Sequence, residues 1–172
     1  VSGGLHGVGA PVVNALSQWL EVEVRDGKNR YFQRFERGVP TEDLKMIGQT
    51  DLTGSVITFK ADETMFESIE YDYDILLTRM REQAFLNAGV RITFSDFRQQ
   101  QPVVNSFCYE GGVRSFVEYL HEVKDLVHED VICMSCTDAS QNCSVEIAMQ
   151  YNTGYNEVIY SFANNIKTPE GG

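Results

Sequence analysis

A glycine-dense loop at the start of the chain constrains its fold more than any other feature. Four glycines fall within seven positions: Gly3, Gly4, Gly7 and Gly9. Apolar residues recur at helical spacing directly after this loop, and the pattern predicts a helix. Its apolar face holds Val12, Val13, Leu16 and Leu20. Glycine lets the backbone approach a ligand closely, and the free N–H groups at a helix start attract anions. The pattern therefore indicates a phosphate-binding loop, with a glycine-rich turn before an ordinary helix as the alternative.

The chain is acidic along its whole length. Its 172 residues carry a formal net charge of −11, and residues 1–107 and 108–172 each hold more acidic than basic side chains. Surfaces that grip nucleic acid are normally basic, so these residues are not expected to form a main DNA-contacting face. Hydrophobic residues make up 42% of the sequence, which is enough for a packed core. No apolar run approaches the length of a transmembrane helix.

Two of the four cysteines, Cys133 and Cys136, have the C-x-x-C spacing of metal and redox sites. The residues around them predict a strand, which places positions 133 and 136 on opposite faces. Cys108 and Cys143 provide no second pair of this kind. Reduced thiols in the core of an intracellular protein are therefore favoured over a metal or redox site.

Helical and extended patterns are mixed along the chain, without internal repeats. A helix is predicted over residues 72–87, and another begins after Gly111 and Gly112. Strands are predicted at residues 21–25, 31–35, 45–48, 55–59, 90–94, 103–109, 131–136, 144–151 and 157–162. The polar stretch within residues 97–107 is either a domain junction or the turn of a hairpin. This mixture predicts the α+β class, with strands meeting helices on one side.

Several sequence strings resemble one known family. The run V-S-G-G-L-H-G-V-G at residues 1–9, followed by V-V-N-A-L-S at residues 12–17, resembles the nucleotide-lid motif of the ATPase subunits of type II DNA topoisomerases. Further segments are similar to later landmarks of that family, in the family's order: residues 35–40, 53–55, 81–87, 109–112, 164–166 and 171–172. The resemblance covers essentially the whole chain, which looks truncated at both ends relative to the family.

The resemblance implies two domains. Residues 1–107 correspond to the C-terminal part of an ATPase domain of the GHKL (Bergerat) superfamily, in which helices lie on a mixed sheet and a lid covers ATP. Residues 108–172 correspond to the N-terminal part of a transducer domain with a ribosomal protein S5-like fold.

The resemblance also implies which residues hold the nucleotide. In the family the lid wraps the phosphates of ATP with backbone N–H groups. The corresponding residues here are Gly3, Gly4, Leu5, His6, Gly7, Val8, Gly9 and Ala10. Ser55 stands at a landmark whose hydroxyl helps hold the adenine, with an ordinary serine at a strand start as the alternative. Arg25 matches a position at the mouth of the nucleotide pocket in that family. The alternative is an ordinary solvent-exposed arginine in a hairpin.

Much of the family's catalytic machinery is expected outside this chain. The general-base Glu, the magnesium-binding Asn and the adenine-binding Asp correspond to segments upstream of Val1, and the lysine that reaches the γ-phosphate to a segment beyond Gly172. We therefore expect no catalytic residue and no metal ligand here, with ATP and Mg²⁺ as cofactors of the whole protein. His6 has no carboxylate or cysteine nearby in sequence, which favours packing over service as a base.

The resemblance implies partners for the whole protein. It would work in the cytoplasm and off the membrane, dimerising with a second copy when ATP binds. It would act with a separate DNA-cleaving protein of the family on double-stranded DNA, contacted through other parts of the protein. Within the family, the enzyme that introduces negative supercoils and topoisomerase IV both fit. A non-catalytic interaction module is the alternative from another class, favoured by the missing general base.

Overall fold

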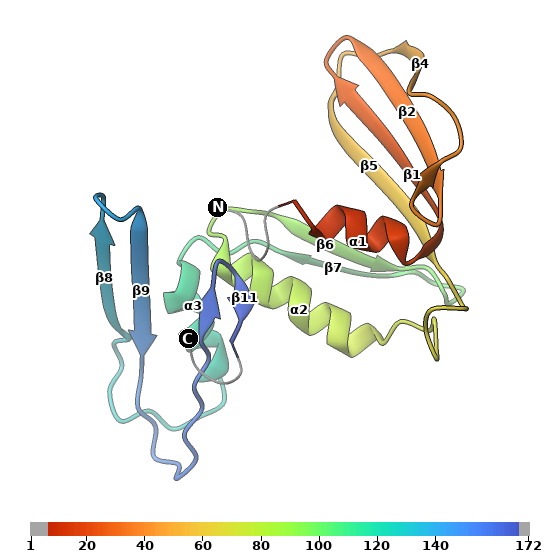
Figure 1. The fold of residues 1–172 in the computed structure, drawn as a ribbon. Coiled ribbons are helices and arrows are strands. Elements are labelled where there is room, and N and C mark those ends of the chain that lie inside the picture. The colour runs from red at the N-terminus through yellow and green to blue at the C-terminus, as the bar shows by residue number, and fades with distance from the viewer. Residues whose placement is uncertain (1–6, 169–172) are drawn as a thin grey trace. The chain divides into compact units, whose positions relative to one another are not determined.

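The computed structural model describes residues 7–168, and the chain divides into two compact units between Glu70 and Tyr71 (Figure 1). We refer to residues 1–70 as the first unit and residues 71–172 as the second unit. The α+β class predicted from the sequence is confirmed, and the strand pairings given by the structure are antiparallel.

The first unit consists of one short helix and an antiparallel sheet. Its elements are α1 (Gly9–Ala15), β1 (Ser17–Asp26), β2 (Asn29–Glu36), β3 (Val39–Pro40), β4 (Lys45–Gln49) and β5 (Thr53–Ala61). The strand order is β3-β2-β1-β5, and β4 also pairs with β2. A tight turn at Gly27, with φ of +86°, joins β1 to β2. Asp26 closes that turn, because its Oδ1 accepts hydrogen bonds from the backbone N–H groups of Lys28 and Asn29.

The register of the sheet separates an apolar face from a charged face. Leu20, Val22 and Val24 of β1 alternate with Glu21 and Glu23, and successive strand residues point to opposite sides. The apolar face continues onto the partners of these residues in β2 and β5, including Tyr31, Phe35, Ile57 and Phe59. On the charged face, Glu21 pairs with Arg34, and Glu23 pairs with Arg25 and Arg30.

The first helix is shorter than the apolar spacing predicts. Helix α1 ends at Ala15 with Leu16 as its C-cap, and β1 begins at Ser17. The prediction that Leu20 shares the helix face is therefore wrong. Leu20 is buried within the sheet, where it pairs with Phe35 and Phe59, because the alternating residues after Trp19 favour a strand.

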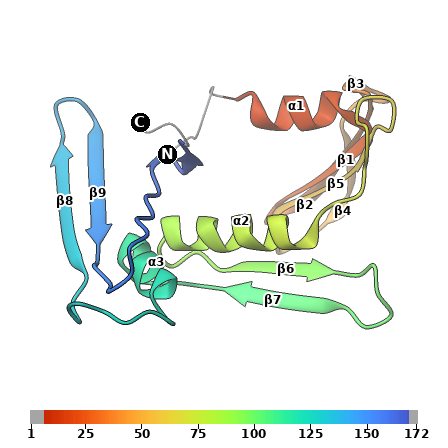
Figure 2. The same ribbon diagram turned by 90° about the horizontal axis from the view of Figure 1, so that it is seen from below.

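The second unit contains two helices and three small hairpins. Its elements are α2 (Tyr73–Leu86), β6 (Ile92–Asp96), β7 (Val103–Phe107), α3 (Gly112–Leu120), β8 (Ile132–Asp138), β9 (Cys143–Met149), β10 (Phe162–Ala163) and β11 (Ile166–Lys167). Asp72 caps α2 by accepting a hydrogen bond from the N–H of Ile75. Helix α2 lies along the β6–β7 hairpin and also packs on α3 (Figure 2).

An aromatic cluster forms the core between α2 and α3. Phe85 is almost fully buried and stacks on Tyr109 with ring centroids 3.7 Å apart. Its ring also lies 5.1 Å from Phe116 and 5.4 Å from Tyr119. Aromatic burial of this kind is a large apolar contribution to folding. The cluster joins residues on both sides of position 107 in one core.

Other local predictions have mixed outcomes. Residues 97–102 connect β6 to β7, so the hairpin interpretation of that stretch is confirmed, while the domain division at 107/108 stays a prediction. The strand predicted at residues 157–162 is wrong, because only Phe162 belongs to a strand there. Cys133 and Cys136 lie on a strand as predicted, but they and Cys143 are exposed rather than buried in a core. No helix among residues 7–168 is long and apolar enough to cross a membrane.

Candidate functional site

The glycine loop enters α1 through a left-handed residue. Gly3, Gly4, Leu5 and His6 lie outside the described residues, whereas Gly7, Val8, Gly9 and Ala10 lie within them and are exposed. Gly7 has φ of +74°, a conformation that glycine adopts without the steric penalty of a side chain. A Cβ atom built on Gly7 or Gly9 would meet no atom of the described residues within 4 Å. None of the described residues therefore covers this part of the loop.

The start of α1 has donors available for an anion. Val8 is the N-cap and provides no side-chain cap, while the backbone N–H of Val12 donates to Val8 O at 3.0 Å. The first N–H groups of a helix have no partner within the helix and need one from elsewhere. Such groups can donate hydrogen bonds to phosphate or carboxylate oxygens. The start of α1 is therefore a candidate anion site formed by backbone groups.

Ser55 and Arg25 lie near the end of the β1–β5 ladder that is distant from α1. Ser55 pairs with Val24, and Arg25 pairs with Gly54, whereas Ser17, the first residue after α1, pairs with Ala61. Val24 lies seven residues beyond Ser17 along β1, which corresponds to about 23 Å. The structure therefore places Ser55 and the C-terminal end of α1 at opposite ends of one ladder and gives no contact between Ser55 and residues 7–10. Arg25 donates a hydrogen bond from Nε to Glu23 Oε1 at 2.7 Å.

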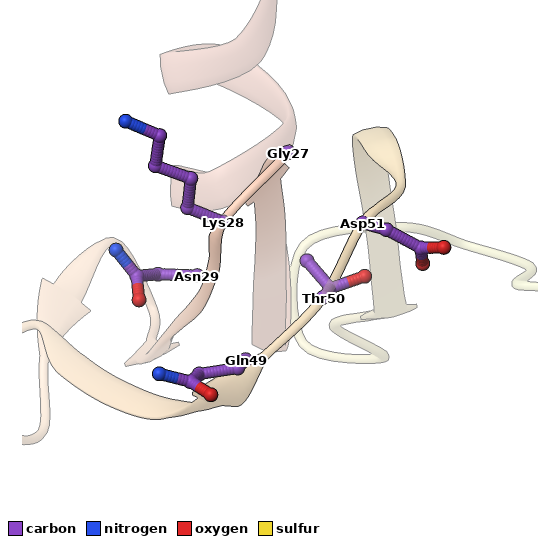
Figure 3. A pocket seen from close by; sticks show the side chains of 6 residues that line it. All are labelled: Gly27, Lys28, Asn29, Gln49, Thr50 and Asp51. Atoms are coloured by element: carbon purple, nitrogen blue, oxygen red, sulfur yellow. The ribbon is translucent and has the colours of Figure 1, made fainter.

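A shallow depression at the tip of the β1–β2 hairpin holds none of the predicted site residues. It is lined by Gly27, Lys28, Asn29, Gln49, Thr50 and Asp51 (Figure 3). In that view Lys28, Asn29 and Gln49 extend to one side and Asp51 to the other. These side chains do not converge on a common point, so the depression lacks the arrangement of a catalytic site.

Two acidic residues on the charged face of the sheet form ion pairs with arginines. Glu21 and Glu23 both face arginines, and hydrogen bonds from Arg30 and Arg25 lower the pKa of Glu23 to about 2. A carboxylate held in this way is a weak base. Within residues 7–168, no three His, Cys, Asp or Glu side chains come together as a metal-binding group.

The sequence did not predict a polar cluster near the C-terminal end of α1. The carboxylate of Asp62 is buried and accepts hydrogen bonds from Arg37 and Thr64. Nothing in the local sequence pattern indicates this cluster, because Arg37 and Asp62 lie 25 positions apart. A second unexpected feature is Asn14, whose buried Oδ1 has no hydrogen-bond partner among the described residues.

Comparison with known proteins gives similarity over the whole chain. The chain is 52% identical over 174 residues to the DNA gyrase B protein of Bacillus mycoides and 54% identical to that of Halalkalibacterium halodurans. Both alignments cover 100% of this chain. A family model described as DNA gyrase B matches residues 112–172.

A solved structure is similar in both sequence and fold. The crystal structure of the 43K ATPase domain of Thermus thermophilus gyrase B, in complex with an aminocoumarin, matches with a TM-score of 0.81 and 39% identity. The match covers 97% of this chain and 45% of that chain. The chain spans 42% of the length of the Bacillus mycoides relative and 27% of the Halalkalibacterium halodurans relative.

Proposed function

The chain belongs to the DNA gyrase B family, and from this membership we propose that it is part of the ATP-hydrolysing component of a type II DNA topoisomerase. The activity of the whole protein would be ATP-dependent negative supercoiling of DNA. The observation that supports this proposal most strongly is 52% identity to a gyrase B protein over the entire chain. The corresponding component of topoisomerase IV is not favoured, since the relatives reported above are gyrase B proteins.

We propose that the glycine loop binds the phosphates of ATP. The backbone N–H groups of residues 3–10 would donate to phosphate oxygens, and the left-handed Gly7 would turn the loop toward them. In support, Gly7 has positive φ, its surroundings are open, and the start of α1 carries no side-chain cap. Ser55 would bind the adenine through its hydroxyl, from the far end of the β1–β5 ladder.

The proposal assigns binding to this chain and chemistry to other parts of the protein. Mg²⁺, when bound, neutralises charge on the phosphates. The residues described here do not form a group suited to hold it, so its ligands would lie elsewhere. The general base would also lie elsewhere in the whole protein, and on the charged face of the sheet Glu21 and Glu23 are already paired with arginines.

We propose two domains within this chain and several partners for the whole protein. Residues 1–107 would belong to the GHKL ATPase domain and residues 108–172 to the transducer domain. The whole protein would act in the cytoplasm with gyrase A on double-stranded DNA, and two gyrase B chains would dimerise on binding ATP.

The experiment that tests the phosphate-binding role is the change Gly7→Val in the full-length protein. A β-branched residue disfavours φ of +74° and restricts the approach of the backbone to a ligand. Because each hydrogen bond to a charged group contributes about 1.5–3 kcal/mol, we expect at least a tenfold loss of affinity. Isothermal titration calorimetry with a non-hydrolysable ATP analogue measures this affinity directly.

A matched control is Gly48→Val on β4. Gly48 also has open space around its Cα and belongs to the same unit, but it pairs with Arg30 near the start of β2, whereas the turn that contacts Ala15 follows the end of β2. We expect this variant to bind the analogue as the wild type does. Wild-type affinity in Gly7→Val would contradict the phosphate-binding role of the loop. A full-length protein without affinity for the analogue would instead favour a non-catalytic interaction module.

A further inference from the structure

Helix α1 is attached to the first unit mainly through its C-terminal end. None of its residues is buried, and Val8 and Val12 are exposed. At the other end, the hydroxyl of Ser17 donates to Val13 O at 2.6 Å, and Ser17 is only 1% exposed. The backbone N–H of Asp62 donates to Leu16 O at 3.0 Å. Among the described residues, α1 is therefore held to the sheet at its C-terminal end, opposite the end that Gly7 and Val8 precede.

The β2–β3 turn supports the same end of α1. This turn contains Arg37 and Gly38, with φ of 48° and 81°. A Cβ atom on Gly38 would lie 3.4 Å from Ala15 Cα, so the turn packs closely against the last residue of the helix. Arg37 is a non-glycine residue in the left-handed region, a conformation that residues with a side chain disfavour. Such strain persists where surrounding contacts impose it. The two-residue β2–β3 turn requires positive φ at both Arg37 and Gly38, because Glu36 pairs with Val39 on either side of it.

The side chain of Arg37 also forms an ion pair with Asp62. Arg37 Nε donates to Asp62 Oδ2 at 2.7 Å. The other carboxylate oxygen, Oδ1, accepts from the backbone N–H of Thr64 at 3.0 Å and from its hydroxyl at 2.8 Å. Both oxygens of a side chain that is 3% exposed are therefore satisfied. Asp62 thus connects the end of β5, the β2–β3 turn and the C-terminus of α1.

We propose that Asp62, held by Arg37, is a positioning residue for the phosphate-binding loop. This inference rests on the proposed nucleotide-binding function. Asp62 and Arg37 fix the direction of α1, and with it the place where the N–H groups around Gly7 and Gly9 meet the phosphates. A seven-residue helix is about 10 Å long, so a tilt of about 6° at its base moves its tip by about 1 Å. Displacement of that size breaks hydrogen bonds to a ligand.

The test compares ligands with and without phosphates in the full-length protein. The variants are Asp62→Asn, which removes the charge of the carboxylate, and Arg37→Asn, which removes the cation but tolerates positive φ. Binding of a non-hydrolysable ATP analogue is measured by calorimetry, and binding of adenosine by ligand-observed NMR. We expect both variants to bind the analogue about tenfold more weakly and to bind adenosine within twofold of the wild type.

A control variant is Lys45→Gln. It removes an exposed ion pair with Glu42 in the same unit, at a turn that does not contact α1. We expect unchanged affinity for both ligands. Wild-type affinity of Arg37→Asn and Asp62→Asn for the analogue, even with a lowered melting temperature, would make the cluster merely structural and overturn the inference. Equal weakening of both ligands would overturn it as well. If the wild-type protein binds adenosine but not the analogue, the proposed function itself fails.

Discussion

Hydrogen bonds from neighbouring side chains keep three carboxylates strongly acidic. Arg30 and then Arg25 lower the pKa of Glu23 to about 2. The amide and hydroxyl of Thr64, followed by Arg37, lower that of Asp62 to about 2. Arg98 has the same effect on Asp96 in the second unit, where the pKa is also about 2. Each of these groups is ionised in the folded protein at any pH near neutrality.

At this scale we expect acid to destabilise the fold between about pH 4 and pH 2. The folded pKa of Glu23 lies below its ordinary value of 4.5, so its contribution is complete above that value. The contribution is lost as the pH falls through the folded pKa of about 2. In Glu23→Gln, urea unfolding at a series of pH values should give a shallower loss of stability over this interval.

Glu67→Gln controls for the removal of one acidic side chain, because Glu67 is exposed in the same unit. If the free energy of unfolding falls with pH as steeply in Glu23→Gln as in the wild type, Glu23 is not a source of the acid sensitivity.

The sequence correctly predicted a strand at Glu23. Its partners could not be predicted, since Arg30 reaches it across the β1–β2 hairpin and register is set by the folded sheet.

At the scale of elements, α2 holds the β10–β11 hairpin by polar contacts. Gln83 Nε2 donates to Asn165 O at 2.9 Å, and Asn165 Nδ2 donates to Asn87 Oδ1 at 2.9 Å. Next to them, buried Glu82 forms an ion pair with Arg79 at 2.6 Å and lies 3.8 Å from Lys167 Nζ. The hairpin turn has Asn164 and Asn165 at positive φ, which asparagine tolerates better than most residues.

We expect Gln83→Met to loosen this hairpin with little effect elsewhere. Methionine retains the length and flexibility of the side chain but cannot donate to Asn165 O, so about 0.5–1.5 kcal/mol should be lost. Amide hydrogen exchange at residues 162–167 should accelerate, while exchange within α2 stays near the wild-type rate. Gln99→Met, in the exposed turn between β6 and β7, is the control. Unchanged exchange in the hairpin would show that other contacts hold it.

Strongly patterned elements could be predicted from the sequence, and weakly patterned ones could not. Residues 72–87 carry a clear helical pattern, and α2 forms there with Asp72 as its cap. The alternation around Val22 and Ile57 likewise gives β1 and β5. The segment 157–162 has an extended pattern, but its residues 157–161 obtain no partner strand among the described residues, and a strand requires one. The exposure of Cys133 and Cys136 also depends on what packs over β8, which no local pattern encodes.

At the scale of the whole molecule, we expect this chain alone not to hydrolyse ATP. A general base must lie within about 3 Å of the attacking water, or one water away. The acidic residues of the charged sheet face are paired with arginines, and the described residues hold no group of metal ligands. Phosphate release from magnesium-ATP should stay at background for this chain and rise in the full-length protein. Equal rates in the two would place the base within residues 1–172.

The sequence predicts the glycine loop as a phosphate site from residue type, because the proposed hydrogen bonds come from the backbone. Within the described residues, Gly7 has positive φ and a helix begins at Gly9, while phosphate binding itself stays a prediction. The support behind the loop could not be identified in the same way. It joins Ala15, Arg37 and Asp62, which come together only when the strand order of the sheet is known.

The strand order also determines when each edge of β1 becomes paired during synthesis of the chain. Strand β1 pairs with β2 across a short turn. Its other edge remains unpaired until β5 is made, because the β1–β5 ladder joins residues as distant in sequence as Ser17 and Ala61. Non-local pairing of this kind is slow compared with closure of a hairpin. While the chain leaves the ribosome, the edge of β1 with Leu20, Val22 and Val24 stays unpaired, and open apolar edges promote aggregation. That vulnerable interval ends once Ala61 has emerged and β5 covers the edge.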